Sequence, residues 1–177
     1  MSVRGDFVEC SLARHGGAIL DIFNDAIAHS TALYDYRPRE PESMVAWFEA
    51  KRRGGFPVIG LESAQGVLMG FGSYGTFRAW PAYKYTVEHS LYVHRDHRGQ
   101  GLGAGLLRAL IERATAQGLH VMVGGIDAAN TASIRLHEKL GFTHAGTVRQ
   151  AGFKFGRWLD LAFYQLILAT PVEPVDG

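Results

Sequence analysis

One stretch of the sequence, residues 87–105, constrains the fold and the function more than any other. It reads VEHSLYVHRDHRGQGLGAG, which predicts a β-strand, then a basic turn, then a glycine-rich entry into a helix. From Leu102 onward the apolar residues recur at the spacing of one helix face. Three polar residues, Glu88, His89 and Ser90, interrupt the apolar strand and are therefore candidates for a functional role.

The glycines at the start of this helix predict a phosphate-binding loop. Gly99, Gly101 and Gly103 leave the backbone N–H groups bare, and the dipole at a helix N-terminus favours an anion. Arg95 and Arg98 come directly before these glycines and add positive charge. The alternative is a helix start without a ligand, but so many glycines lower helix stability unless they serve a function. We therefore expect a pyrophosphate site.

Two common phosphate-binding motifs fit this loop poorly. A P-loop requires Lys followed by Ser or Thr after its glycines, and this sequence has no such pair there. The dinucleotide fingerprint G-x-G-x-x-G/A is met by Gly99, Gly101 and Ala104, but residues 94–98 separate the strand from the first glycine, and the dinucleotide turn is tighter. The third pattern, R-x-x-R-G-x-G-x-G, is met in full and resembles the acyl-CoA pyrophosphate loop of the GNAT N-acetyltransferases.

A second motif, NTASIRLHEKLGF at residues 130–142, resembles the GNAT segment that follows the fifth strand. The resemblance implies that Asn130 binds the pantetheine arm of CoA. In that family a tyrosine near the helix centre lies close to the CoA sulfur, and here His137 stands in its usual place. An imidazolium can protonate a leaving thiolate, so His137 is a candidate general acid. A purely structural role for His137 in helix packing remains the alternative.

The rest of the chain predicts one α/β domain with a mixed, mostly antiparallel sheet flanked by helices. We expect the domain to span residues 1–170 and to be followed by a frayed tail, residues 171–177. The sequence patterns predict strands at residues 7–12, 56–61, 67–77, 87–93, 119–126 and 155–168. They predict helices around residues 19–27, 41–54, 102–114 and 130–140.

Three segments together narrow the resemblance to one subgroup. TVEHSLYV, RLHEKLGF and AGFKFGRWLD look like segments of the phosphinothricin and methionine sulfoximine N-acetyltransferases. The resemblance implies a GNAT fold and direct transfer of acetyl from acetyl-CoA to the α-amine of a small amino acid or analogue, in a ternary complex. It also implies a homodimer. The aromatic and glycine-rich segment 150–158 is a candidate interface, and an internal hairpin packing on its own sheet is the alternative.

Glu88 is the candidate general base, because an α-ammonium must lose a proton before its nitrogen can attack a thioester. A carboxylate on a half-buried strand has a raised pKa and can accept that proton. His89 and Ser90 are candidate substrate contacts through their backbone. Arg78 is the candidate ligand for the acceptor carboxylate, since arginine binds carboxylates with a two-pronged fork. The resemblance places Ala79 and Trp80 beside the acceptor as well. For Glu88 and for Arg78, the alternative to a functional role is an ordinary solvent-exposed charged side chain.

The expected acetyl-CoA site combines backbone and side-chain contacts. Backbone groups of Leu91, Tyr92 and Val93 would pair with pantetheine as an added strand does. The pyrophosphate would be held by Arg98, Gly99, Gln100, Gly101, Leu102, Gly103 and Ala104.

The composition excludes several other classes. A net charge of +1 indicates no nucleic-acid partner, and the single cysteine excludes a disulfide framework or a cysteine-based metal site. The histidines show no metal-binding spacing. The N-terminus lacks a signal-peptide pattern and no stretch is long enough to span a membrane, so we expect a cytoplasmic enzyme. The remaining rivals are a GNAT acting on a polyamine or a protein N-terminus, a non-catalytic acyl-CoA-binding module and, more distantly, a dinucleotide oxidoreductase.

Overall fold

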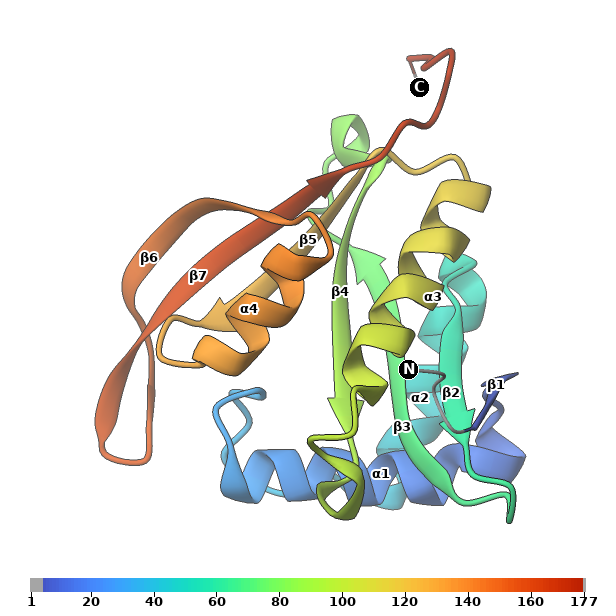
Figure 1. Ribbon diagram of the computed structural model, residues 1–177, viewed down its shortest axis with the longest axis vertical. Helices are drawn as coiled ribbons and strands as arrows, with labels where there is room; N and C mark the ends of the chain where they lie inside the picture. The colour runs from blue at the N-terminus through green and yellow to red at the C-terminus, as the bar shows by residue number, and fades with distance from the viewer. Residues whose placement is uncertain (1–4, 177) are drawn as a thin grey trace. The chain divides into compact units, whose positions relative to one another are not determined.

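The computed structural model describes residues 5–176, which divide into two compact units (Figure 1). The first unit contains the described residues up to Tyr74 together with Ser90–Leu110; the second contains Gly75–His89 and the described residues from Ile111 onward. The elements are β1 (Asp6–Glu9), α1 (Leu12–His29), α2 (Pro41–Gly54), β2 (Val58–Glu62), β3 (Leu68–Thr76), β4 (Thr86–Val93), α3 (Leu102–Ala116), β5 (Val121–Asp127), α4 (Thr131–Lys139), β6 (Thr143–Lys154) and β7 (Arg157–Ile167).

In the first unit, helix α1 begins earlier than the sequence pattern predicts. The predicted strand 7–12 is too long, because β1 ends at Glu9 and Leu12 already starts the helix. The side chain of Ser11 accepts a hydrogen bond from the backbone N–H of Arg14 at 3.3 Å, which is a typical helix N-cap. Helix α2 ends as predicted, since Gly55 takes the left-handed conformation with φ 66°.

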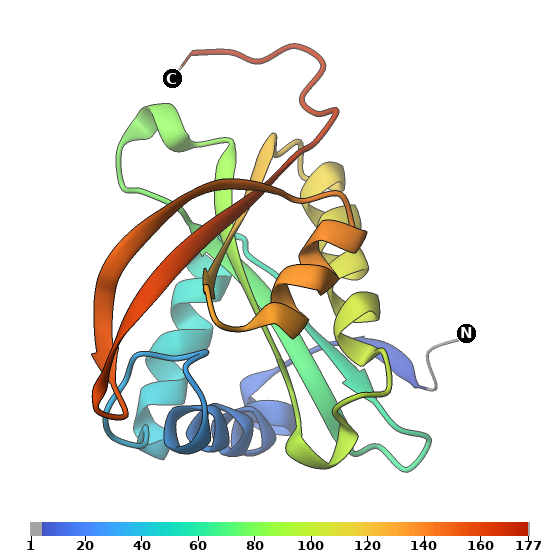
Figure 2. The ribbon, with the colours of Figure 1, turned by 60° about the vertical axis from the view of Figure 1, so that its left-hand side comes forward.

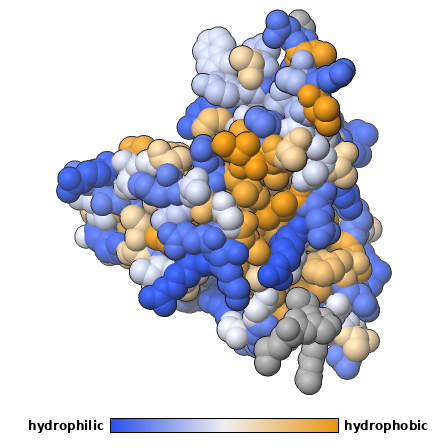
Figure 3. Space-filling model, turned by 45° about the horizontal axis from the view of Figure 1, so that its top comes forward, coloured by the Kyte–Doolittle hydropathy of each residue, from blue (hydrophilic) through white to orange (hydrophobic). Residues whose placement is uncertain are grey.

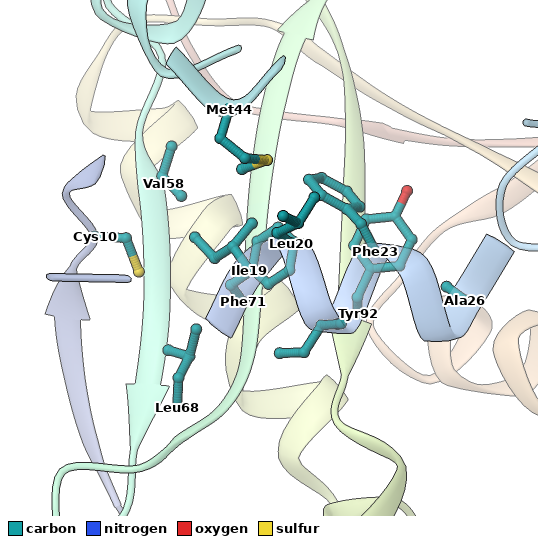
Figure 4. Close-up of a cluster of buried hydrophobic side chains, with 11 residues drawn as sticks. Cys10, Ile19, Leu20, Phe23, Ala26, Met44, Val58, Leu68, Phe71 and Tyr92 are labelled. Atoms are coloured by element: carbon teal, nitrogen blue, oxygen red, sulfur yellow. The ribbon is translucent and has the colours of Figure 1, made fainter. Parts of the chain in front are cut away.

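The core of the first unit is a cluster of buried hydrophobic side chains between α1, α2 and the strands, with the aromatic rings of Phe23, Phe71 and Tyr92 among them (Figure 4). Phe23 of α1 contacts Trp47, Phe71 and Tyr92 edge-on, with ring centroids 5.1 to 5.5 Å apart. Tyr92 of β4 therefore points into the core. Gly70 is needed in β3, because a side chain there would come within 2.8 Å of the Tyr92 carbonyl oxygen.

The strand pairing confirms the predicted α/β fold class with a mixed, mostly antiparallel sheet. The strand order is β1-β2-β3-β4 in the first unit and β4-β5-β7-β6 in the second, since β4 contributes residues to both. β5 is parallel to β4, with Thr86 paired to Val121 and Glu88 paired to Val123. β1 with β2, β2 with β3, β5 with β7 and β6 with β7 are antiparallel pairs.

The sequence reading missed strand β6, which forms a long hairpin with β7 (Figure 2). The predicted final strand 155–168 starts too early, because Phe155 and Gly156 form the hairpin turn with φ 52° and 72°. β6 was missed because most of its residues are exposed, so it lacks an apolar alternation. Its register also shifts twice, at residues 144–146 and 148–152.

Two further expectations concern the ends of the chain. In the predicted tail, the backbone N–H of Val175 donates to the Tyr85 hydroxyl at 3.1 Å. The signal-peptide expectation depends partly on residues 1–4, which lie outside the described residues. Among residues 5–176, no helix has both the length and the apolar character that crossing a bilayer requires.

Candidate active site

The glycine loop at the start of α3 presents open backbone, as a phosphate site requires. Gly99 and Gly101 have φ 77° and 78°, a conformation that favours glycine, and a Cβ built on either would meet no atom within 4 Å. A ligand can therefore reach the main chain at both positions. Gln100 is exposed as well, whereas the Leu102 side chain is buried and can offer only its backbone. The N–H of Ala104 already donates to the Gly101 carbonyl at 3.2 Å.

The arginines before the loop are held by a residue that the sequence reading did not single out. Asp25 of α1 accepts a hydrogen bond from Nη2 of Arg98 at 2.8 Å and lies 3.4 Å from Nη1 of Arg95. Partial burial alone would raise the pKa of Asp25, but Arg98, Arg95 and His29 together hold that pKa below its ordinary value. The link between residues 25 and 98 gives no signal in the sequence, because it exists only after α1 has packed.

The strand residues expected to meet the pantetheine arm lie in the same unit as the loop. Leu91 and Val93 are half-buried, and the Tyr92 side chain is held in the aromatic core. Only the backbone of Tyr92 is therefore left for a ligand. The carbonyl oxygen of Val93 accepts a hydrogen bond from Nε of Arg98 at 3.2 Å, which ties the strand to the glycine loop.

In the second unit, Glu88 has the environment expected of a general base. It lies on β4 and is half-buried, and its carboxylate packs over Gly125, where an added Cβ would come within 3.1 Å of Oε1. Burial raises the pKa of Glu88, and the positive charge of Arg78 offsets this only in part. Within the described part of the chain, no hydrogen bond or ion pair engages the Glu88 carboxylate. It is therefore free to accept a proton.

The residues proposed for the acceptor lie in an exposed loop after β3. Arg78 is exposed and donates to the carbonyl oxygen of Phe77 at 2.7 Å, with its guanidinium 4.3 Å from the Phe77 ring. Ala79 is also exposed, and Trp80 keeps 73% of its surface accessible. The structure thus places the charge of Arg78 within electrostatic reach of Glu88, and leaves Trp80 uncovered.

An apolar groove of about 570 Å³, which the sequence reading did not predict, lies on the same sheet face as Glu88. Thr86 lines it, and side chains two residues apart on a strand share a face. Val123, the pairing partner of Glu88, lines it too. The lining residues are Phe77, Tyr83, Thr86, Val121, Val123, Ala145, Gly146, Thr147, Val148, Phe163 and Gln165. They come from separate segments, so no sequence motif could reveal the groove.

On the opposite face of β4, His89 and His137 form a buried pair. Their Nε2 atoms are 3.1 Å apart and their rings stack at 5.0 Å. Gly124 makes room for them, because a Cβ there would lie 2.8 Å from Nε2 of His89. Burial lowers the pKa of His89 to about 3, with a smaller contribution from His137, and burial also lowers the pKa of His137. Both rings are therefore neutral near pH 7.

The hydrogen bonds assign the protons of this neutral pair. Nδ1 of His137 lies 2.7 Å from the Ser133 carbonyl oxygen, which can only accept, so Nδ1 carries the proton. Nε2 of His137 then accepts, and Nε2 of His89 donates to it. Nδ1 of His89 is left as a buried acceptor with no partner among the described residues. A neutral His137 in this state has no proton to give from Nε2.

Asn130 begins α4, and its side-chain oxygen accepts from the Ser133 backbone N–H at 3.1 Å. The oxygen is thus used as a helix cap, and the amide NH₂ is the part of Asn130 that could serve a ligand. Within residues 5–176, no three His, Cys, Asp or Glu side chains are grouped so that they could hold a metal ion.

Comparison with known proteins identifies the family. The chain belongs to the acetyltransferase (GNAT) family, whose model matches residues 20–142. It is 51% identical over 150 residues to an L-methionine sulfoximine/L-methionine sulfone acetyltransferase of Pseudomonas paraeruginosa, covering 85% of this chain and 87% of the relative. It is 36% identical over 157 residues to a phosphinothricin N-acetyltransferase of Streptomyces viridochromogenes, covering 89% and 85%.

A solved structure agrees with this assignment. The crystal structure of a GNAT superfamily phosphinothricin acetyltransferase from Sinorhizobium meliloti, in complex with acetyl-CoA, matches with a TM-score of 0.93. The two chains are 32% identical, and the match covers 99% of this chain and 95% of the other. The acetyltransferase class and the use of acetyl-CoA, both expected from the motifs, are therefore confirmed.

Proposed function

We propose that this protein transfers the acetyl group of acetyl-CoA to the α-amine of a small amino acid or analogue, of the methionine sulfoximine, methionine sulfone or phosphinothricin type. The names of its relatives support this acceptor class. The observation that carries the proposal is Glu88, a half-buried carboxylate with a raised pKa and no described partner, three residues before Leu91 on the same strand.

In the proposed reaction, acetyl-CoA supplies the acetyl group as an activated thioester. The backbone of Leu91, Tyr92 and Val93, the loop from Arg98 onward and the amide of Asn130 hold the CoA moiety. Arg78 binds the acceptor carboxylate with its guanidinium fork, and the backbone of His89 and Ser90 helps to position the acceptor. Glu88 takes one proton from the acceptor ammonium, directly or through water, so that the nitrogen lone pair can attack.

The apolar groove on the sheet face of Glu88 suits the methylene and methyl groups in the side chain of such an acceptor. Its walls are mainly aromatic and aliphatic, with Thr86, Thr147 and Gln165 as polar exceptions. Pockets of this composition bind apolar groups and use a few polar atoms to set orientation. A polyamine would instead require a row of carboxylates, and the residues lining this groove include no acidic side chain.

We also propose that the protein is a cytoplasmic homodimer, with segment 150–158 in the interface. This segment contains the tip of the β6–β7 hairpin, where Phe153, Phe155 and Trp158 keep 46%, 57% and 59% of their surfaces exposed. The space-filling view in Figure 3 shows apolar areas of surface between hydrophilic ones. Light scattering at micromolar protein should give the mass of a dimer, and a monomer would contradict this part of the proposal.

A panel assay tests the proposed function. Release of free CoA from acetyl-CoA should be measured with methionine sulfoximine, methionine sulfone, phosphinothricin, the common amino acids, a polyamine and a short peptide. We expect the highest kcat/KM with the amino-acid analogues, and a large loss when their carboxylate is replaced by an amide. Turnover only with the polyamine or the peptide would overturn the acceptor class. Binding of CoA without turnover of any acceptor would favour a non-catalytic module.

A further inference from the structure

A network of four charged or titratable side chains in the first unit joins helix α1 to the glycine loop. Asp25 is at its centre, and only 15% of its side chain is exposed. One carboxylate oxygen accepts from Nη2 of Arg98 at 2.8 Å. The other lies 3.4 Å from Nη1 of Arg95 and 3.2 Å from Nδ1 of His29. The arginines are 62% and 51% exposed, so the cations face solvent while the carboxylate does not.

The contacts of Arg98 engage two of the three nitrogens of its guanidinium group. Nε donates to the Val93 carbonyl oxygen at 3.2 Å, and Nη2 donates to Asp25. Nη1 has no hydrogen-bond partner within the described part of the chain. A guanidinium group is planar and carries five N–H donors. Holding Nε and Nη2 in place therefore also sets the direction in which Nη1 points. The N–H groups of Nη1 remain available to an anion at the adjacent Gly99 and Gly101.

We propose that Asp25 is a positioning residue for acetyl-CoA: its carboxylate holds Arg98, with help from Arg95, in the orientation that binds the pyrophosphate. This inference rests on the proposed function, because it needs the glycine loop to be the pyrophosphate site. The charges are compatible with it. Within this contact, one carboxylate and two arginines leave a net charge of +1, so the arginines are not fully neutralised and can still attract an anion. Orientation reduces the entropy that Arg98 loses when the ligand binds.

The opposite reading is that Asp25 competes with the phosphates for Arg98. The two hypotheses predict opposite changes in CoA affinity. If Asp25 positions the arginine, removing its charge weakens CoA binding; if it competes, removing its charge strengthens binding. The sign is therefore decided by Asp25→Asn, which keeps the size of the side chain.

The experiment compares this variant with a matched control on the same helix. Asp21 lies one turn earlier on α1 and is exposed, so Asp21→Asn removes the same charge without touching the network. Isothermal titration with CoA gives the Kd, and steady-state kinetics give the KM for acetyl-CoA and kcat. We expect Asp25→Asn to raise the Kd for CoA and the KM for acetyl-CoA about fivefold each and to change kcat less than twofold. Asp21→Asn should change none of these three quantities. Asp25→Glu, which retains the charge, should restore most of the affinity.

A double variant shows whether Asp25 acts through Arg98. Arg98→Ala alone should weaken CoA binding, and adding Asp25→Asn to it should cause little further loss. Tighter binding by Asp25→Asn, unchanged binding, or losses that add fully with Arg98→Ala would each overturn the inference. If Arg98→Ala and the glycine-loop variants bind CoA as the wild type does, the fault lies in the proposed loop site itself. Melting curves of each variant confirm that the protein compared is folded.

Discussion

The glycine loop of the first unit and His137 of the second were both singled out from sequence motifs, but their surroundings in the structure differ in kind. In the loop, Gly99 and Gly101 have the open, left-handed backbone that a phosphate site needs. In α4, His137 stands where the family has a tyrosine, yet its neutral tautomer has both ring nitrogens already engaged. The loop glycines thus have an open backbone, whereas both ring nitrogens of His137 are within hydrogen-bond distance of neighbours.

The difference arises from what each function depends on. A phosphate loop works through its own backbone, and glycine fixes that backbone locally. An acid or a base works through its pKa, which is set by neighbours from elsewhere in the chain. His137 takes its environment from His89, 48 residues away, and Glu88 takes part of its environment from Gly125. Proton chemistry is therefore harder to infer from a motif than anion binding.

Glu88 offers the largest test of this contrast. Glu88→Gln keeps the size of the side chain and removes the base, so we expect turnover to fall by roughly 100-fold or more. Because burial raises the pKa of Glu88, wild-type kcat/KM should rise with pH as the carboxyl group ionises. The deficit of the variant should shrink at high pH, where more of the acceptor amine is already neutral. Rate measurements from pH 6 to 10 check this.

The Kd for CoA serves as the control in that experiment and should hardly change in Glu88→Gln. If Glu88→Gln turned over at the wild-type rate at neutral pH, the direct-base mechanism would be contradicted. A loss of constant size at every pH would instead indicate a structural role for the carboxylate.

A second test concerns the loop. We expect Gly101→Val to weaken CoA binding by roughly tenfold or more, because the side chain would block access to the backbone and the φ of 78° would be strained. Gly66 provides a matched control: it has φ 76°, open space around it, and a place in the turn between β2 and β3. Gly66→Val should lose comparable stability but no CoA affinity. Titration of both folded variants separates strain from lost binding, and equal affinities would refute the loop assignment.

The same contrast explains which parts of the fold and of the candidate site could be predicted from the sequence. The helices and β2 to β5 were predicted because their apolar periodicity or glycine and proline boundaries are local signals, such as Gly55 after α2. β6 was missed because its exposed residues carry no such pattern. At the site, Glu88 and the loop glycines were found from motifs. Asp25, the apolar groove and the His89–His137 contact were not, because each joins residues that only the folded chain brings together.

A third test asks whether His137 is a general acid. We expect His137→Phe to lower kcat by less than about tenfold, whereas loss of a true acid typically costs 100-fold or more. The substitution leaves the Nε2–H of His89 without its acceptor in a buried site, so it should lower the free energy of unfolding by about 1–3 kcal/mol. Kinetics and urea unfolding on one preparation separate the two effects. A 100-fold loss of kcat with stability unchanged would restore the acid role.

A fourth test, which changes no residue of the wild-type protein, concerns the pH dependence of stability that the histidine pair confers. The pKa of His89 is lowered to about 3 in the folded protein, against an ordinary value near 6.5, so between these values the unfolded chain binds more protons. Stability should therefore fall as the pH falls from 6.5 towards 5, with a contribution from His89 whose slope approaches about 1.4 kcal/mol per pH unit.

Urea unfolding at several pH values in this narrow range isolates the histidines, because most carboxylates are already ionised there. His89→Phe should flatten the slope, since it removes one titrating group from the buried pair. If wild-type stability were constant from pH 6.5 to 5, the pair would have to be protonated in the fold. The neutral tautomers inferred from the Ser133 contact would then be wrong, and His137 would again be able to donate a proton.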